Sequence, residues 1–439
     1  MPNIFYIPSA VLDTLEEISN QYKAIYKDKN PNHLITEWLD LCFSHTKFKV
    51  PEFAIKDYQM ALNFLYNYRG SSDTFVAYRR DVERLLQWSW LVRNQSILSH
   101  KREDIEAFIE FCLKPPKRWI GLKRDTRFKN INGEKRPNPA WKPFEAHVSK
   151  QDHNEGIKPD KNNYQFSQQA LKVMFGILSS FYNYLLQEEI IQGNPLLLIR
   201  QKSKFFQKQI KTQTIRRLSN QQWEMVINLA KEKAAEDITH ERTVFIFSCL
   251  YAMYLRISEL IASRRWTPTM GDFFKDSDGY WWFKTIGKGN KARQIAVSDA
   301  MLEALKNYRM TYLKLSPLPS SDEKIPLIPH IKNSNKSMTS DGPIRRLVQE
   351  FFDLAANQLE SKGNLEEANG LRKATVHWLR HTGISEDVKH RPREHVRDDA
   401  GHSSSAITDR YIDVELKERG KSAKNKPLNV YQRSLKIMD

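Results

Sequence analysis

The sequence predicts a mainly α-helical protein with a small antiparallel β-sheet, built as a helical domain followed by a mixed α+β domain. Three observations support this prediction. The chain has 439 residues, enough for two or three domains with buried cores. Apolar residues recur with the helical period along most of the chain. Short strand-like segments separated by turn residues gather near residues 272–297.

The first half of the chain is predicted to be helical. Residues 1–50 form a small helical lead-in, and residues 51–199 form a helical domain. Within 71–92, apolar residues fall on one helical stripe that suits core packing, namely Phe75, Tyr78, Val82, Leu85 and Leu86. The same helix carries three arginines on its other faces, namely Arg79, Arg80 and Arg84. Helical periodicity returns at 167–192, and Gly193-Asn194-Pro195 is expected to end that helix.

Residues 115–165 interrupt the helical pattern. This segment contains six prolines and three glycines and shows no sustained period. Twelve Lys and Arg residues against six Asp and Glu are interleaved with four large aromatic residues, namely Trp119, Phe128, Trp141 and Phe144. A long loop of this kind is usually functional or disordered. Two interpretations stay open: a solvated surface insertion, or a loop that contacts a polyanion.

A basic linker is predicted to join the two domains. Residues 200–217 contain seven basic residues and no acidic one, and four of these are Lys202, Lys204, Lys208 and Lys211. Ser219 followed by Gln222 fits a capping box that opens the next helix. The second domain therefore spans about 213–439. It is predicted to be mostly helical up to about residue 416, with strands near 272–297.

The charge balance indicates a polyanionic partner. Sixty-nine Lys and Arg against 52 Asp and Glu give a net charge of +17. Nucleic acid is favoured over a membrane surface, because the basic residues are spread along the chain rather than placed on one amphipathic helix. The N-terminal sequence does not resemble a signal peptide, and no apolar run approaches membrane-spanning length. The three cysteines lie far apart, which is typical of buried free thiols in a reducing cytoplasm.

Four segments of the second domain carry possible chemistry. Arg256 lies in the apolar stretch 244–262, which is predicted to be one helix, with Glu259 three residues later. Taken alone, this pair is a structural ion pair. Lys288 lies on a predicted hairpin tip between two glycines, with Lys291 and Arg293 close behind. Taken alone, Lys288 is an exposed turn lysine.

The other two segments contain histidines and a tyrosine. His377, Arg380 and His381 share one helical face. A zinc site is disfavoured, because the zinc-protease pattern requires Glu directly after the first His and Trp378 stands there. Tyr411 follows His402 by nine residues, so both can face one site.

Together these residues suit in-line attack on a phosphodiester. Two arginines grip non-bridging oxygens and stabilise the transition state. A lysine can protonate the leaving oxygen, a histidine can assist proton transfer, and a tyrosine can act as the covalent nucleophile. No carboxylate cluster for Mg²⁺ accompanies them, so this chemistry is predicted to need no metal or nucleotide cofactor.

The order of these motifs resembles the signature of tyrosine recombinases, a family that includes phage integrases and Xer-type resolvases. The matching segments are LRISEL at 255–260, GKGNKAR at 287–293, HWLRHT at 377–382 and GHSSSAITDRY at 401–411. The resemblance covers about 215–415 well. Residues 54–200 resemble the family's helical domain only in helix placement and in the closing Gly-Asn-Pro. The resemblance implies the catalytic residues Arg256, Lys288, His377, Arg380, His402 and Tyr411, supported by Glu259.

The resemblance also implies how the protein works. By this resemblance, residues 51–199 correspond to a core DNA-binding domain. This domain and the catalytic domain are expected to form a clamp around duplex DNA. We expect DNA contacts from Arg79, Arg80, Arg84, Lys202, Lys204, Lys208, Lys211 and Arg293. Tyr411 is implied to form a 3′-phosphotyrosyl link in site-specific recombination or integration, as in mobile genetic elements. A homotetramer on two DNA sites, possible accessory proteins and a place on the cytoplasmic nucleoid are also implied.

Two alternatives remain from the sequence: a type IB topoisomerase-like enzyme and a catalytically inactive DNA-binding protein. The first shares the chemistry but would relax supercoils without pairing sites. The second would show damage in the signature, and none is visible. One departure from the family pattern stands out: residues 386–399 are unusually charged and contain Pro392.

Overall fold

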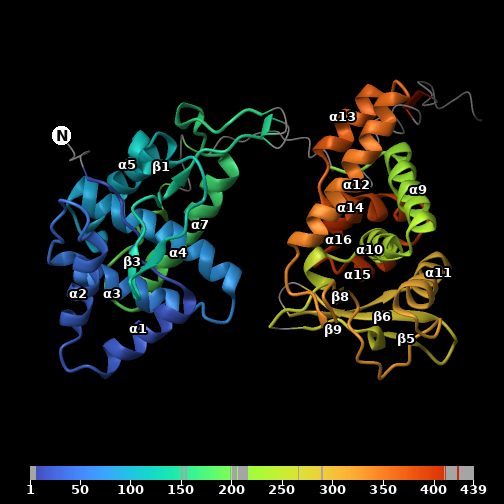
Figure 1. Ribbon diagram of the computed structural model, residues 1–439. Coiled ribbons are helices and arrows are strands. Elements are labelled where there is room, and N and C mark those ends of the chain that lie inside the picture. Colours follow the sequence, from blue (N-terminus) through green and yellow to red (C-terminus); the bar gives the residue numbers. More distant parts are fainter. Residues whose placement is uncertain are drawn as a thin grey trace, which may run out of the picture. The chain divides into compact units, whose positions relative to one another are not determined.

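The computed structural model describes residues 6–149, 152–153, 156–197, 199, 205, 216–264, 266–287, 290–409, 411 and 423–424. The chain divides into two compact units, residues 1–210 and 211–439 (Figure 1). Most of the predicted linker 200–217 lies outside the described residues, including all four of its named lysines, so its role stays a prediction. No helix in the described part of the chain has the length and apolar character that a membrane span requires.

The N-terminal unit is a helical bundle with small additions of β-structure. Its helices are α1 (Leu15–Lys27), α2 (Pro31–Phe43), α3 (Phe53–Tyr66), α4 (Ser72–Trp88), α5 (Arg102–Leu113) and α7 (Gln168–Gln187). The predicted stripe of α4 forms part of the core: Phe75, Val82, Leu85 and Leu86 are buried, and Tyr78 is half-buried. Burial of this apolar stripe is what holds α4 against its neighbours.

The segment 115–165 is largely folded, which the sequence did not predict. It contains four short strands, namely β1 (Ile120–Gly121), β2 (Phe128–Ile131), β3 (Glu134–Pro137) and β4 (Phe144–Glu145). The strands β2 and β3 pair antiparallel, and β1 and β4 pair parallel. Trp119, Trp141 and Phe144 are buried, so these aromatic residues stabilise the unit and are not free to contact a partner.

Helix α7 ends earlier than predicted. It stops at Gln187, and Glu189 adopts the left-handed conformation with a φ of 57°. The sequence pattern placed the end at Gly193, because glycine is the usual residue for this conformation. A left-handed glutamate gives no such signal, so the end of α7 was not visible in the sequence.

The C-terminal unit combines helices with one three-stranded sheet. Its helices are α9 (Asn220–Glu236), α10 (Glu241–Ala252), α11 (Asp299–Asn307), α12 (Gly342–Ser361), α13 (Leu365–Lys373), α14 (Val376–Asp387), α15 (Arg393–Ala400) and α16 (Ser405–Asp409). The strands β5 (Phe273–Lys275), β6 (Trp281–Ile286) and β7 (Ala292–Ala296) pair antiparallel in chain order. Figure 1 shows this sheet at one end of the unit, below most of the helices.

The structure confirms the predicted fold class and the predicted three-stranded meander. Phe283 of β6 faces Phe273 and Ile295 on the adjacent strands, and all three side chains are buried. The predicted capping box is also present: Ser219 accepts from the backbone of Gln222, whose side chain accepts in return. The alternation of apolar residues and the capping box both involve residues close together in the sequence. This explains why the sequence alone predicted them.

Two predictions about this unit are wrong. The stretch 244–262 is not one helix, because α10 ends at Ala252 and Tyr254 takes a left-handed φ of 50°. The apolar run continues past the helix end with no Gly or Pro to mark it, so periodicity did not reveal the break. The region after the sheet also holds an unpredicted hairpin, formed by β8 (Pro329–His330) and β9 (Asn333–Ser337).

Candidate active site

A buried glutamate organises the first part of the candidate site. Glu259 is 2% exposed and lies in a short 3₁₀ turn that begins directly after Arg256. Its carboxylate accepts from the backbone N–H of Arg256 at 2.8 Å and from Arg256 Nη1 at 3.0 Å. Arg293 of β7 donates to both carboxylate oxygens at 2.8 Å. Glu259 therefore fixes two guanidinium groups, one of which, Arg256, keeps 27% of its side chain exposed.

The charge of Glu259 is maintained by these two arginines. Burial by itself raises the pKa of a carboxyl group, because the charged form loses hydration. Here the hydrogen bonds and positive charge of Arg293 and Arg256 outweigh burial and lower the pKa of Glu259 below its ordinary value. Glu259 is thus ionised at neutral pH, and its charge offsets part of the repulsion between the two arginines.

Arg293 has a different position from the one the sequence predicted. We expected it to contact DNA, but its side chain is only 8% exposed and both its Nη groups bind Glu259. Its Nε donates to the backbone carbonyl of Asp399 at 3.0 Å. Arg293 therefore supports the arginine cluster from behind. The tertiary partner that buries it lies 34 residues away in the sequence, so the hairpin pattern alone did not reveal it.

The hairpin that carries the predicted lysine begins against this cluster. A Cβ atom on Gly287 would lie 2.8 Å from Arg293 Nη1 and 3.0 Å from Glu259 Oε1, so a larger residue would have to displace these two side chains. The glycine serves close approach to the protein's own ion cluster. Lys288 and Gly289 lie outside the described residues, and Lys291 is exposed. The role of Lys288 stays a prediction.

Arg380 of α14 is the most buried of the predicted catalytic residues, at 3% exposure. Its Nη1 donates to the carbonyl of Tyr254, and its Nη2 donates to the carbonyl of Ala400 at 2.5 Å. A guanidinium has five N–H donors, so donors remain for a substrate after these two bonds. Burial, together with the charge of Arg256, lowers the pKa of Arg380 to about 9, which leaves it protonated at neutral pH.

Tyr411 lies among histidines of its own chain. It is 7% exposed, and its hydroxyl lies 2.5 Å from Nδ1 of His381. The ring of His402 stacks on the Tyr411 ring with centroids 5.8 Å apart and an interplanar angle of 15°. His402 is itself held by Thr408, whose hydroxyl lies 2.9 Å from its Nδ1. The Tyr411 hydroxyl is therefore placed next to a possible proton acceptor.

Both of these histidines are neutral at pH 7. Burial, together with the nearby His377 and Arg380, lowers the pKa of His381 to about 3. Burial and the positive charges of Arg380 and Arg256 lower the pKa of His402 to about 4. A neutral imidazole has one nitrogen free to accept a hydrogen bond from an attacking hydroxyl. A bound phosphate would raise the basicity of that nitrogen, because its negative charge stabilises the protonated ring.

His381 is the site residue that the sequence assignment missed. The shared helical face of His377, Arg380 and His381 was visible in the sequence, but His381 was weighed only as a metal ligand. The structure brings its ring within 4.3 Å of the exposed His377, measured between centroids, and into contact with Tyr411. Among the described residues, no group of three or more His, Cys, Asp or Glu side chains is arranged to hold a metal ion.

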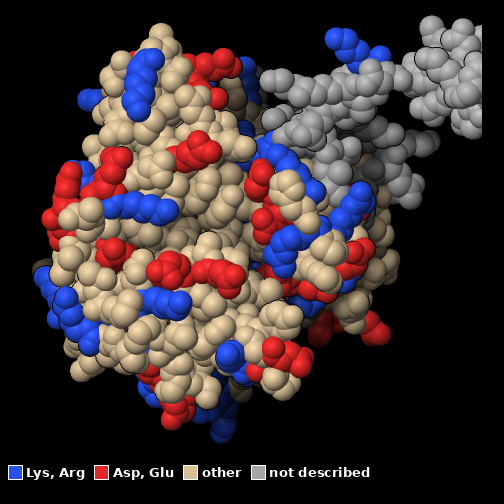
Figure 2. All heavy atoms as spheres, turned by 90° about the vertical axis from the view of Figure 1, so that its right-hand side faces the viewer, with Lys and Arg blue, Asp and Glu red and all other residues tan. Residues whose placement is uncertain are grey.

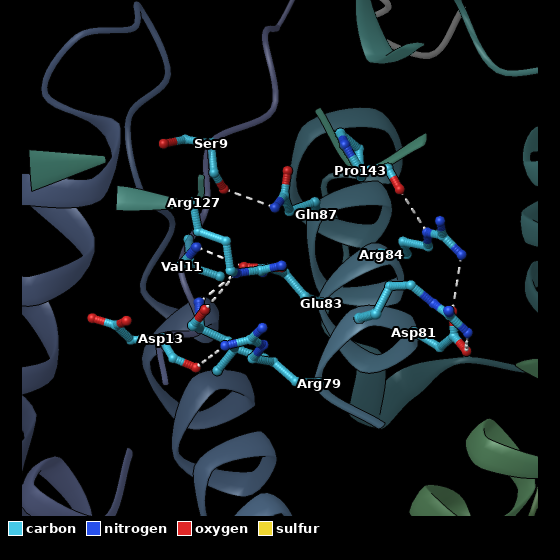
Figure 3. A network of polar contacts seen from close by, with 12 residues as sticks. Ser9, Val11, Asp13, Arg79, Asp81, Glu83, Arg84, Gln87, Arg127 and Pro143 are labelled. Carbon is cyan, nitrogen blue, oxygen red and sulfur yellow. Dashed lines mark hydrogen bonds and ion pairs between the residues drawn. The ribbon is translucent and has the colours of Figure 1, made fainter. Parts of the chain in front are cut away.

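The three arginines of α4 are engaged within the N-terminal unit, and Figure 3 shows Arg79 and Arg84 with their partners. Arg79 donates to the backbone carbonyl of Asp13 at 2.5 Å. Arg80 and Arg84 both bind Asp81, at 2.8 and 2.9 Å, and Arg84 also donates to the carbonyl of Pro143 at 2.8 Å. We expected all three to bind DNA. Arg84 instead stabilises the packing of α4, because the buried carboxylate of Asp81 requires paired cations. Arg79 is held by the carbonyl of Asp13.

The face of the C-terminal unit on which α9 and α11 lie carries charges of both signs (Figure 2). Blue and red side chains are interspersed over this face, without a continuous field of one sign. The net charge of +17 is therefore not concentrated in the part of this face that Figure 2 shows.

Comparisons with known proteins agree with this site. The profile of the phage integrase family matches residues 216–418, which contain every predicted catalytic residue. A tyrosine recombinase XerC from Pediococcus pentosaceus is 27% identical over 240 residues, covering 54% of this chain and 68% of the relative. A XerC from Chlorobaculum parvum is 25% identical over 253 residues, covering 54% of this chain and 66% of the relative.

Solved structures of the same kind are also similar. A lambda integrase dimer bound to a core site aligns with a TM-score of 0.47 and 12% identity, covering 82% of this chain and 77% of that one. Three observations agree with one another: the order of the motifs, the profile match, and the presence in one unit of Arg256, Glu259, Arg380, His402 and Tyr411. The C-terminal unit therefore matches the phage integrase family over residues 216–418, and the relatives that it resembles are tyrosine recombinases.

Proposed function

We propose that this protein is a site-specific DNA recombinase or integrase that cleaves and rejoins DNA through a 3′-phosphotyrosine on Tyr411. The observation that carries the proposal is the 2.5 Å contact between the Tyr411 hydroxyl and a neutral His381, in the same unit as the arginine cluster. A phenol beside a proton acceptor and buried guanidinium groups is suited to attack on a phosphodiester.

The proposed cleavage step assigns one role to each group. The Tyr411 oxygen attacks phosphorus as its proton passes to His381, and the bond to the 5′ oxygen breaks. Arg256 and Arg380 stabilise the charge that develops on the non-bridging oxygens. Lys288 protonates the departing 5′ oxygen, which leaves a free 5′-hydroxyl. Attack by a 5′-hydroxyl on the phosphotyrosine then reverses the step and rejoins the strand.

His402 and His377 complete the assignment. His402 keeps the Tyr411 ring in place by stacking, and its pKa of about 4 makes it a second neutral group beside the nucleophile. His377 is exposed on the same face of α14 and can reach a bound phosphate. We further propose that the two units clamp duplex DNA, that four copies act on two sites, and that the enzyme works on DNA in the cytoplasm.

The experiment that tests this function supplies the purified protein with DNA that carries candidate sites. Recombination predicts a Tyr411-dependent covalent adduct and exchange of strands between two sites. Relaxation of supercoiled DNA without strand exchange would instead indicate a topoisomerase-like enzyme. DNA binding without any adduct would indicate a binding protein.

The two arginines proposed to bind the phosphate, Arg256 and Arg380, give a prediction about the rate of cleavage. We expect Arg256→Ala to cleave DNA roughly 10²–10³-fold more slowly, because one donor to the transition state is lost. Its DNA affinity should change little, since many other basic residues contact the backbone. Glu259 keeps its bidentate bond to Arg293 in this variant, so the fold should persist. The measurement is single-turnover cleavage at saturating DNA.

Two further variants serve as a comparison and a control for Arg256→Ala. Arg380→Ala should show a loss of similar size, with added instability because it leaves the carbonyls of Tyr254 and Ala400 without their donor. Arg372→Ala removes a half-buried arginine that pairs with Glu360 and should cleave normally. If Arg256→Ala also cleaves normally, the Arg256–Glu259 contact is only a structural ion pair, and Arg256 does not stabilise the transition state.

The N-terminal unit offers a second prediction, about binding. A cleft of about 750 Å³ lies between α4, the segment 115–165 and the start of α7, and its lining includes Lys123, Arg124 and Lys142. Lys123 and Arg124 are exposed, and Lys142 is half-buried. We propose that these three cations contact the DNA backbone, in place of the paired Arg79 and Arg84.

Replacing Lys123, Arg124 and Lys142 together with alanine should weaken binding about equally on all DNA sequences. Each lost phosphate contact should reduce the slope of log affinity against log salt by about 0.9. The matched control replaces three exposed lysines of the α1 region that do not line the cleft, namely Lys23, Lys27 and Lys29. An equal change of slope in both triple variants would show that the cleft has no special part in binding.

A further inference from the structure

The C-terminal end of α15 holds several groups of the candidate site at once. The carbonyl of Ala400 accepts from Arg380 Nη2 at 2.5 Å, and the carbonyl of Asp399 accepts from Arg293 Nε at 3.0 Å. The carboxylate of Asp399 accepts from the backbone N–H of Ala296 in β7 at 3.2 Å. A shift of this helix end therefore moves Arg380, Arg293 and the β7 strand together.

A single arginine behind the site fixes this helix end. Arg391 lies in the turn between α14 and α15, and its Nη2 donates to Asp399 Oδ2 at 2.6 Å. Its Nη1 donates to the Tyr254 hydroxyl at 3.0 Å and to Asp387 Oδ2 at 3.3 Å. The Asp399 side chain is 6% exposed and the Arg391 side chain is 31% exposed, so the contact is shielded from water on the Asp399 side. Arg391 thus joins the end of α14, the end of α15 and the turn after α10.

The turn after α10 needs the contacts of Arg391 because it contains Tyr254. This fully buried tyrosine has a φ of 50°, a conformation that is unfavourable for residues other than glycine and that persists only where the surroundings enforce it. Its hydroxyl donates to Asp387 and accepts from Arg391, while its carbonyl accepts from Arg380 Nη1. Both carbonyls that hold Arg380 therefore belong to backbone segments that contact Arg391 or its partner Asp399.

We propose that Arg391 is a positioning residue for DNA cleavage. Bonded to Asp399 and to the Tyr254 hydroxyl, it fixes the two carbonyls that aim Arg380 at the phosphate. The proposal rests on the proposed function, in which Arg380 stabilises the transition state. It also explains the unusual charge of residues 386–399, because Asp387, Arg391 and Asp399 form one internally paired cluster within that segment.

The first test compares Arg391→Gln with the wild-type enzyme at saturating DNA. We expect cleavage to be about 10–100-fold slower, because a displacement of about 1 Å in a catalytic group costs up to about 10²-fold in rate. The dissociation constant for DNA should stay within about twofold. The matched control is Lys389→Gln, which removes a cation of the same segment that pairs with Glu386 at 3.1 Å, and it should cleave within about twofold of wild type.

The second test separates positioning from general structural damage with a double-mutant cycle. If Arg391 acts through Arg380, the loss caused by Arg391→Gln should shrink to less than about threefold in an Arg380→Lys background, where the aimed guanidinium is already absent. Independent damage would multiply the two losses. If Arg391→Gln melts more than about 10 °C below wild type, Arg391→Lys replaces it in the same cycle, with a smaller loss and the same expected shrinkage.

Wild-type cleavage rates in Arg391→Gln, or losses that multiply fully in the cycle, would overturn the proposal. Failure of the proposed function has a different appearance: the wild-type enzyme would then form no Tyr411-dependent adduct at all. The two failures are therefore distinguishable from the same set of gels.

Discussion

Replacing Tyr411 with phenylalanine should abolish the covalent protein–DNA adduct and leave DNA binding intact. The change removes the attacking oxygen and its 2.5 Å contact with His381, but it keeps the aromatic ring. That ring packs in a small apolar cluster with Tyr254, Ile384 and neighbouring residues, and stacks on His402. The fold of the unit should therefore survive, while the adduct falls below detection.

The measurement uses a nicked suicide substrate, in which the released fragment diffuses away and the adduct accumulates on a denaturing gel. Tyr251→Phe is the matched control, because this tyrosine of the same unit stacks on Trp223 with centroids 4.1 Å apart. It should form the adduct at the wild-type rate. An adduct that persists in Tyr411→Phe would show that another residue is the nucleophile.

Local sequence signals predicted much of this molecule correctly. The three-stranded sheet at 273–296 was visible because apolar residues alternate along the strands, and glycine-containing turns at 276–279 and 287–290 separate them. The capping box at Ser219 and Gln222 was visible because both partners lie within one helical turn. The order of motifs that brought Arg256, Arg380 and Tyr411 into one unit was likewise readable from the chain itself.

The remaining features depend on contacts between residues distant in sequence. From the sequence, Arg293 was expected to be an exposed hairpin arginine. In the structure it is buried by its contacts with Glu259 and Asp399. Arg79 looked like a DNA contact until the carbonyl of Asp13, 66 residues earlier, accepted its hydrogen bond. The break after α10 rests on a left-handed Tyr254, which no composition rule predicts. Charge pattern alone thus identifies cations, but their partners decide which ones remain available.

The hairpin after β6 carries the other prediction with a large expected effect. The leaving group in cleavage is a 5′ alkoxide, which departs poorly unless it is protonated, and a lysine ammonium can supply that proton. Gly287, which precedes Lys288 in the sequence, lies against the cluster of Arg256, Glu259 and Arg293. We propose Lys288 rather than Lys291 as the proton donor, because GKGNKAR at 287–293 resembles the hairpin-lysine motif of the family. We therefore expect Lys288→Ala to cleave ordinary DNA roughly 10²–10⁴-fold more slowly, the range typical of a lost general acid.

A sulfur substitution separates this role from charge stabilisation. In a substrate whose bridging 5′ oxygen is replaced by sulfur, the leaving thiol has a pKa near 8.5, so a thiolate leaves without an acid. Lys288→Ala should then recover most of its rate. Arg380→Ala should not recover, because its task lies on the non-bridging oxygens, and the exposed Lys291 should tolerate alanine on either substrate. If sulfur restores nothing to Lys288→Ala, the proton comes from elsewhere, and Lys291 or one of the histidines beside Tyr411 becomes the candidate for the general acid.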